Sequence, residues 1–203
     1  MEITVLGATG GTGSLVVREA LAAGHDVTVL VRDPAAAAGL DPGVRVVAGD
    51  ARDLDAVTRA VRGARGVISA IGTRETGRST LITDCMTTVV AALPAGTRLL
   101  AVSTVGAGGT ARQLPLPVRA IVTGLLRNAI ADHDGQERAI IGSDLDWTIA
   151  RCVGLTDAAP TGQVHVLTDG RVGGSRIARA DVARWLVANL GDSTWSRQAV
   201  TLW

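Results

Sequence analysis

Residues 3–13 read ITVLGATGGTG, and this stretch decides the fold. Its first four residues form a mostly apolar run, typical of a strand buried on both faces of a parallel sheet. Gly7, Gly10 and Gly13 follow at once, and glycine lets the chain turn sharply and lets an anion approach the backbone. The next residues predict an amphipathic helix, whose N-terminus directs amide groups and the positive end of its dipole at the loop. The stretch therefore predicts a strand, an anion-binding loop and a helix.

A second apolar strand, Val27–Val31, follows that helix, and this strand–helix–strand unit is typical of dinucleotide binding. The residue after the second strand is normally acidic and binds the ribose 2′-hydroxyl, but here Arg32 comes first and Asp33 second. Arginine suits a 2′-phosphate, because its planar guanidinium makes charge-assisted hydrogen bonds. We therefore expect NADP(H) in preference to NAD(H). The alternative is that Arg32 is a solvated surface charge and Asp33 is the ribose ligand.

The glycine spacing and the VLVRD run at residues 29–33 resemble the short-chain dehydrogenase/reductase superfamily, in its extended and atypical branches. More narrowly, the chain resembles the NmrA-like NAD(P)-binding group, which includes the NADPH-dependent flavin reductase also called biliverdin-IXβ reductase. Further similar segments lie at residues 49–50, 72–74, 103–104, 145–149 and 177–183. The resemblance implies an α/β fold: a single Rossmann-type domain, residues 1–203, with a doubly wound parallel sheet, helices on both faces, and small substrate-side segments at about 104–117 and 152–180.

Composition excludes several classes of function. The 203 residues include 20 basic and 19 acidic groups and contain no apolar run long enough for a membrane span. The arginines are dispersed and only four aromatic residues, all Trp, are available to stack on bases. We therefore expect a cytoplasmic protein, monomer or homodimer, that binds a small-molecule acceptor, no nucleic acid and no membrane. Cys85 and Cys152 have no metal-binding or redox spacing, so no metal site is expected.

The chain contains no Tyr and no Lys, since all 20 of its basic residues are arginines. The tyrosine–lysine proton relay of the larger branch of the superfamily is therefore impossible here. In that branch the catalytic lysine lies on the helix that here carries Gln136 and Glu137. His133, in the same segment, is a candidate acid because histidine titrates near neutral pH. The alternative is a lone histidine in an acidic, exposed stretch.

The cofactor-binding residues are expected in the glycine loop and at the carboxyl ends of the strands, where ligands bind in doubly wound sheets. Asp50 matches the adenine-edge position of the similar proteins; the alternative is a loop aspartate that caps its own turn. A backbone amide near Val153 is expected to bind the carboxamide. The full set of expected cofactor-binding residues is Gly7, Thr9, Gly10, Gly11, Thr12, Gly13, Arg32, Asp50, Ala51, Ala70, Ile71, Gly72, Thr73, Cys152 and Val153.

The resemblance also places candidate catalytic and substrate-binding residues. Ser103 and Thr104 match the hydroxyl pair that faces the nicotinamide or the substrate, although such hydroxyls also form ordinary turns. Arg74 is a candidate for both catalysis and substrate binding, and Arg176 is a second candidate for holding an anionic substrate. The alternative for Arg74 is a solvated loop arginine. Flavin-reducing relatives carry a histidine after the sixth strand, which this chain lacks.

Two later segments have structural interpretations. Residues 105–117 predict a long loop with little regular structure, which is placed to cover the substrate. The helix expected to begin near Val118 carries an apolar stripe for core packing, formed by Ile121, Val122, Leu125 and Ala129. Arg179 and Asp181 are interpreted as structural, with Asp181 capping the last helix.

The sequence therefore predicts an NADPH-dependent reductase that transfers hydride to a flavin, FMN or FAD, or to a similar conjugated acceptor. Hydride addition to N5 of an isoalloxazine needs positioning more than a protein acid, which suits a chain without Tyr and Lys. One alternative is an NmrA-like redox sensor that binds NADP(H) and reports its occupancy without turnover. Another is an atypical quinone or sugar reductase of the same superfamily.

Overall fold

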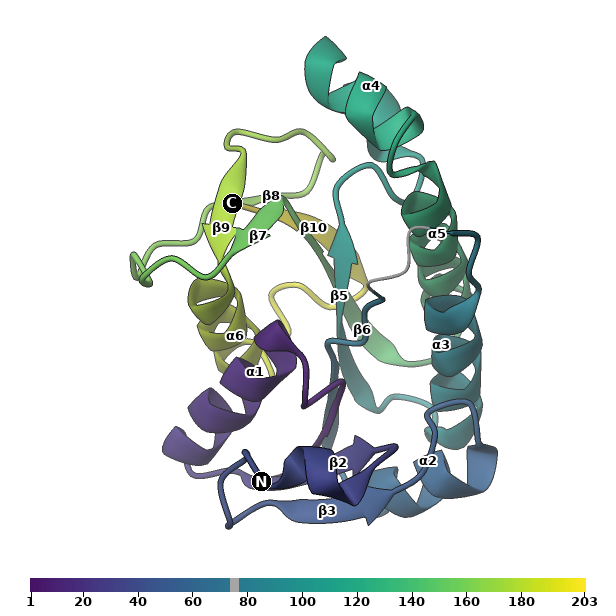
Figure 1. Cartoon of the computed structure of the whole chain (residues 1–203), viewed down its shortest axis with the longest axis vertical. Coiled ribbons are helices and arrows are strands. Elements are labelled where there is room, and N and C mark those ends of the chain that lie inside the picture. The colour runs from purple at the N-terminus through teal and green to yellow at the C-terminus, as the bar shows by residue number, and fades with distance from the viewer. Residues whose placement is uncertain (74–76) are drawn as a thin grey trace.

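The computed structural model describes residues 1–73 and 77–203 (Figure 1). The expected Arg74 site falls outside the described residues. The helices are α1 (Gly11–Ala22), α2 (Leu54–Val61), α3 (Leu81–Ala92), α4 (Leu116–Thr123), α5 (Arg127–Ile141) and α6 (Arg179–Ala188), with 3₁₀ helices η1 (Pro34–Ala37) and η2 (Thr110–Gln113). The strands are β1 (Glu2–Leu6), β2 (Asp26–Val31), β3 (Arg45–Ala48), β4 (Gly66–Ser69), β5 (Arg98–Thr104), β6 (Asp146–Cys152), β7 (Gly154–Thr156), β8 (Val166–Leu167), β9 (Arg176–Ala178) and β10 (Gln198–Leu202).

The main sheet has the order β3-β2-β1-β4-β5-β6-β10-β8, and all of its pairings are parallel except that of β8 with β10. Strand β1 lies between β2 and β4, with Val5 opposite Val29 on one side and Ile68 on the other. The chain winds outward in both directions from β1, so a crevice opens at its carboxyl end. Strands β7 and β9 form a separate parallel pair. This arrangement confirms the Rossmann-type α/β fold.

Helices cover both faces of the sheet (Figure 1), and each face has its own core. On one face, apolar residues of α1 and α6 pack against the sheet, among them Val16, Val17 and Leu186, which are at most 1% exposed. On the other face, α2, α3 and α5 supply residues such as Val57 and Met86. Strands covered on both sides explain why β1 and β4 are mostly apolar and almost entirely buried.

The segment after β5 differs from its prediction. Residues 105–117 contain a 3₁₀ helix, η2, and the start of α4 at Leu116, whereas the sequence predicted a loop with little regular structure. Pro115 is the N-cap of α4 and Pro117 lies in its first turn, where proline fits because the amide there has no helical partner. The run of prolines therefore starts a helix.

The apolar stripe expected on this helix does not pack in the core throughout. Val122 is buried in a small cluster with Leu114 and Ile130. Ile121 is 53% exposed and Leu125 is 83% exposed, so the expected core packing is wrong for both. Figure 1 shows that α4 projects beyond the rest of the fold. Leu125 lies outside α4, in the connection to α5, because the helix expected to continue to Ala129 ends at Thr123.

Asp181 does not cap α6, contrary to the prediction. The helix begins at Arg179, with Ala178 as its N-cap, and Asp181 lies buried within the first turn. Its carboxylate accepts hydrogen bonds from the amide of Thr161 (2.8 Å), the hydroxyl of Thr161 (3.0 Å) and the amide of Gly162 (3.0 Å). Asp181 therefore anchors the loop after β7 to α6, which is a structural role of another kind.

Candidate cofactor pocket

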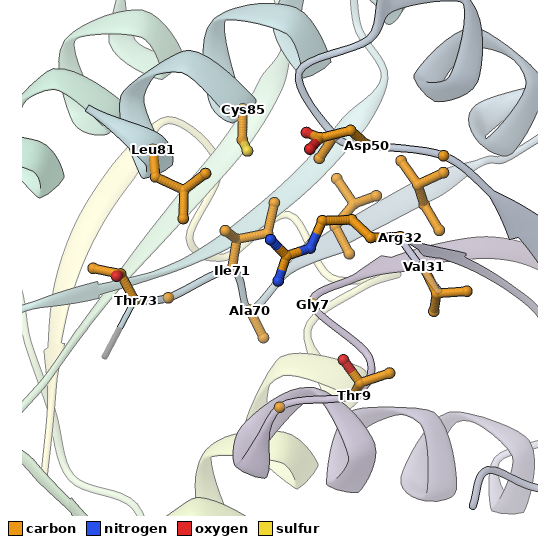
Figure 2. A pocket seen from close by; sticks show the side chains of 16 residues that line it. Gly7, Thr9, Val31, Arg32, Asp50, Ala70, Ile71, Thr73, Leu81 and Cys85 are labelled. Atoms are coloured by element: carbon orange, nitrogen blue, oxygen red, sulfur yellow. The ribbon is translucent and has the colours of Figure 1, made fainter. Parts of the chain in front are cut away.

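A cavity of about 500 Å³ opens at the carboxyl ends of β1, β2 and β4 (Figure 2). Ten of the residues expected to bind the cofactor line this cavity: Gly7, Thr9, Gly10, Arg32, Asp50, Ala51, Ala70, Ile71, Gly72 and Thr73. It is completed by Leu6, Leu30, Val31, Gly49, Leu81 and Cys85. The cavity lies where the strand order diverges from β1, as the sequence predicted.

The glycine loop is shaped by close backbone contacts. Gly7 has a φ of +76°, and a Cβ atom there would stand 2.6 Å from the carbonyl oxygen of Ala70. A Cβ on Gly13 would collide with the carbonyl group of Gly7, so the helix can begin directly behind the turn. Gly10 is the N-cap of α1 and has no side chain to satisfy the first amides of the helix. These amides are therefore directed at the loop as donors for an anion.

Arg32 and Asp33 have different environments, which bears on the alternative left open by the sequence. Arg32 lines the cavity, and Figure 2 shows its side chain extending into it from the end of β2. Asp33 is the N-cap of η1, and its carboxylate accepts a hydrogen bond from the amide of Ala35 at 2.9 Å. The geometry therefore favours Arg32 as the residue that meets the ribose of a bound dinucleotide.

Asp50 also lines the cavity, and it is held by a residue that the sequence did not single out. Arg52 donates from Nε to Oδ1 (3.0 Å) and from Nη2 to Oδ2 (2.8 Å) of Asp50, and the amide of Arg52 also donates to Oδ1. The hydrogen bonds from the Arg52 side chain lower the pKa of Asp50 to about 2. Asp50 is thus a carboxylate at neutral pH, and it caps its own turn as well as lining the cavity.

Helix α3 closes the cavity with Leu81 and Cys85, neither of which was predicted as a site residue. Burial raises the pKa of the Cys85 thiol to about 11, so it is an apolar wall and not a nucleophile at neutral pH. Cys152 is also a buried free thiol, as expected. The sequence signal for Cys85 was its place on the apolar face of the helix, which does not distinguish a core residue from a cavity wall.

Ser103 and Thr104 point to opposite faces of the sheet, because side chains alternate along a strand. Ser103 is 3% exposed, and its hydroxyl donates to Oε1 of Glu137 at 2.7 Å. Thr104 is only half-buried. The prediction that both hydroxyls face the nicotinamide or the substrate therefore fails for Ser103, whose hydroxyl is directed into the core.

Glu137 is the centre of a buried polar cluster at this place. Arg151 donates to it from Nε (3.0 Å to Oε1) and from Nη2 (2.6 Å to Oε2), and both side chains are buried. Gly108 packs so closely over the pair that a Cβ there would overlap both side chains. Glu137, on the helix that the resemblance places in the catalytic-lysine region of the larger branch, is thus a carboxylate paired with Arg151. Sequence reasoning missed this pair because Arg151 is distant in the chain.

His133 is part of the same helix but not of an acid–base pair. Its Nδ1 lies 3.0 Å from Oε1 of Gln136, and the amide nitrogen of Gln136 donates to the carbonyl oxygen of Val102. Burial lowers the pKa of His133 below its ordinary value, so the ring is neutral at neutral pH. It is not the exposed histidine that the alternative assumed.

The remaining predicted residues do not line the cavity. Thr12 and Gly13 are buried within the first turn of α1, behind Gly11. Cys152 and Val153 are packed in the core at the end of β6, on the side covered by α1 and α6. Arg176 is exposed at the start of β9. Among the described residues no group of side chains has the composition of a metal site, and no helix is long and apolar enough to cross a bilayer.

Residues 7–193 match the profile of a family described as NAD(P)H-binding. The chain belongs to this NAD(P)H-binding family. In sequence, 71 of its residues are 35% identical to the uncharacterized protein YLL056C of Saccharomyces cerevisiae, a match over 34% of this chain and only 24% of the yeast protein.

Solved structures of the same fold include reductases. ChuY of Escherichia coli O157:H7, described as an anaerobilin reductase, is 27% identical, with a TM-score of 0.82 over 100% of this chain and 96% of its own. A putative NADH-flavin reductase of Streptococcus pneumoniae shares the fold at 22% identity and a TM-score of 0.82, covering 100% and 98%. A short-chain dehydrogenase/reductase of Veillonella parvula in complex with NADP shares it at 18% identity and 0.80, covering 99% and 93%. The chain is therefore an oxidoreductase-like member of the family.

Proposed function

We propose that the protein is an NADPH-dependent reductase that transfers hydride to a flavin or a similar conjugated acceptor. The observation that carries the cofactor part is the pair Arg32 and Asp33. Arg32 reaches into the cavity, while Asp33 is turned away to cap η1. A guanidinium at the end of β2 complements a 2′-phosphate, and the carboxylate of the next residue, Asp33, is engaged in capping η1.

The acceptor part is supported by the polar cluster and by the relatives. Glu137 accepts hydrogen bonds from Ser103 and from Arg151, and the chain has no Tyr or Lys. An acceptor that takes hydride at a conjugated centre and a proton from water needs no proton donor from the protein. ChuY, the relative described as an anaerobilin reductase, is similar over the whole chain. A single domain of residues 1–203 that takes a small acceptor at the nicotinamide side is part of the proposal.

The test compares two coenzymes and one charge reversal. Initial rates are measured for NADPH and NADH with FMN as acceptor, for the wild type and for Arg32→Glu. We expect the wild type to prefer NADPH, and Arg32→Glu to lose about 10- to 100-fold of that preference, the value of roughly 1.5–3 kcal/mol for a charge-assisted contact. Arg62→Glu makes the same change in an exposed residue at the end of α2, away from the cavity, and is the control. An unchanged preference in Arg32→Glu refutes the 2′-phosphate contact.

A sensor that binds NADP(H) without turnover is the second candidate. The observation that favours it is that the hydroxyl of Ser103 is buried and bonded to Glu137, and Ser103 is not among the residues that line the cavity. Tight NADPH binding with no turnover on FMN, FAD, biliverdin or a quinone supports the sensor. Turnover that is fast only with quinones supports the atypical quinone reductase.

A further inference from the structure

A second arginine lies beside the glycine loop, from a distant part of the chain. Arg179 is the first residue of α6, which packs against α1 (Figure 1). Its side chain runs over Gly11, the first residue of α1: a Cβ atom on Gly11 would stand 3.2 Å from both Cδ and Nε of Arg179. The guanidinium carbon lies 3.9 Å from the same position, so the charged group packs over the first residue of α1. Because residue 11 has no side chain, nothing of its own separates the arginine from the loop.

The stability of the fold does not explain this arginine. A cation on the first residue of a helix is disfavoured by the helix dipole. The ion-pair partner of Arg179 is Asp157, with 2.8 Å between Nη1 and Oδ1, and the side chain of Asp157 is 87% exposed. A pair with so exposed a member contributes little to stability, because water screens it. Yet only 27% of the Arg179 side chain is exposed, so the fold buries much of a charged group for a weak contact.

We propose that Arg179 binds the pyrophosphate of the dinucleotide, and that Asp157 holds the guanidinium beside the loop until the cofactor arrives. This inference rests on the proposed function, since it requires a dinucleotide in the cavity. A pyrophosphate at the N-terminus of α1 meets amide donors on one side. Arg179 supplies a planar, charged fork on the other, a geometry that suits phosphate oxygens. In this arrangement the carboxylate of Asp157 competes with the phosphate for the same arginine.

This competition separates a binding role from a structural one. If Arg179 only fastens α6 to the loop of Asp157, removing either member of the pair has the same effect, because the same contact is lost. If Arg179 binds the pyrophosphate, the two changes act in opposite directions. Loss of the arginine weakens cofactor binding. Loss of the Asp157 charge releases the arginine and so strengthens cofactor binding.

The experiment measures dissociation constants for NADPH and for 2′-AMP at low salt by calorimetry, in four proteins. They are the wild type, Arg179→Gln, Arg179→Lys and Asp157→Asn. We expect Arg179→Gln to bind NADPH about tenfold more weakly, which is the size of one charge-assisted hydrogen bond, and Arg179→Lys to recover part of the loss. Asp157→Asn should bind NADPH several-fold more tightly. 2′-AMP carries the 2′-phosphate but no pyrophosphate, so its affinity should stay the same in all four.

Other results overturn the proposal. Wild-type affinity for NADPH in Arg179→Gln, or equal weakening by Arg179→Gln and Asp157→Asn, makes Arg179 a structural residue and leaves the proposed function intact. Equal losses for 2′-AMP and NADPH in Arg179→Gln mean that the whole loop has been disturbed, which also refutes a specific pyrophosphate contact. A wild type that binds neither NADPH nor NADH refutes the proposed function itself. Thermal unfolding of each variant verifies that it is folded.

Discussion

The substitution Glu137→Ala tests how much of the fold depends on the polar cluster. In the wild type the carboxylate of Glu137, 1% exposed, accepts hydrogen bonds from Arg151 and from the hydroxyl of Ser103. Alanine removes both interactions at once. It leaves the guanidinium of Arg151 buried without its partner and the Ser103 hydroxyl without its acceptor, so the cost comes mainly from the groups that remain.

The expected loss of stability follows from the two groups that remain without a partner, the guanidinium of Arg151 and the hydroxyl of Ser103. Breaking a buried ion pair by removing one partner costs about 3–5 kcal/mol. An unsatisfied buried hydroxyl adds about 1 kcal/mol. The free energy of unfolding should therefore fall by about 4–6 kcal/mol, a large part of the roughly 5–15 kcal/mol that a domain has. For a chain of this length that corresponds to a Tm lower by roughly 10–20 °C.

Urea unfolding followed by circular dichroism measures the loss, and a double variant identifies its cause. Replacing both partners, Glu137→Met with Arg151→Met, removes the stranded charge, so it should destabilise less than Glu137→Ala alone. Glu19→Ala is the control, because Glu19 lies 3.8 Å from Arg184 in a more exposed pair and should cost less than about 1 kcal/mol. If Glu137→Ala loses less than about 1 kcal/mol, or if the double variant is less stable than Glu137→Ala, the buried ion pair and hydrogen bond of Glu137 do not make the calculated contribution to stability.

Two further predictions concern the cavity itself. Gly13→Ala should lower the free energy of unfolding by about 1–3 kcal/mol and abolish NADPH binding, because the new Cβ collides with the carbonyl of Gly7. Gly191→Ala, at a site with open space, is the control and should change neither quantity. Urea unfolding measures the stability and calorimetry measures the binding. Asp50→Asn should cost less than about 1 kcal/mol at neutral pH, since the ion pair with Arg52 is partly exposed. Because the pKa of Asp50 is lowered to about 2, its contribution to the free energy of unfolding is present above the ordinary carboxyl range and is lost as pH falls towards 2. The difference in unfolding free energy between wild type and Asp50→Asn should therefore shrink on acidification, and a difference that grows contradicts this.

The part of the site made by backbone was predictable from the sequence. Gly7, Gly10 and the residues after β4 all lie in the cavity, because a glycine turn between a buried strand and a helix has few geometries. Arg32 was predictable for a related reason: a residue that directly follows β2 must lie at the carboxyl edge of the sheet. Short-range patterns that fix the direction of the chain therefore predicted these positions well.

Side-chain partners across the fold were not predictable in the same way. The hydroxyl of Ser103 was expected at a ligand surface, but its direction depends on Glu137, 34 residues later, and on Arg151. Leu125 is exposed in the connection between α4 and α5, because α4 ends at Thr123, and the apolar period did not indicate this end. The position of Arg179 over Gly11 requires α6 to pack on α1, a contact between the two ends of the chain. Each of these features is set by tertiary packing, so periodicity alone cannot give it.

The energetics of the cluster bear on the chemistry that the fold can support. A reaction that used the hydroxyl of Ser103 as a proton donor would first have to break its buried hydrogen bond to Glu137, whose carboxylate is also bound by Arg151. His133 is not a substitute, because burial keeps its ring neutral and Gln136 holds it. An acceptor that receives hydride at a conjugated centre and its proton from water needs no proton from these side chains, and for this reason we favour a flavin-like acceptor over a ketone.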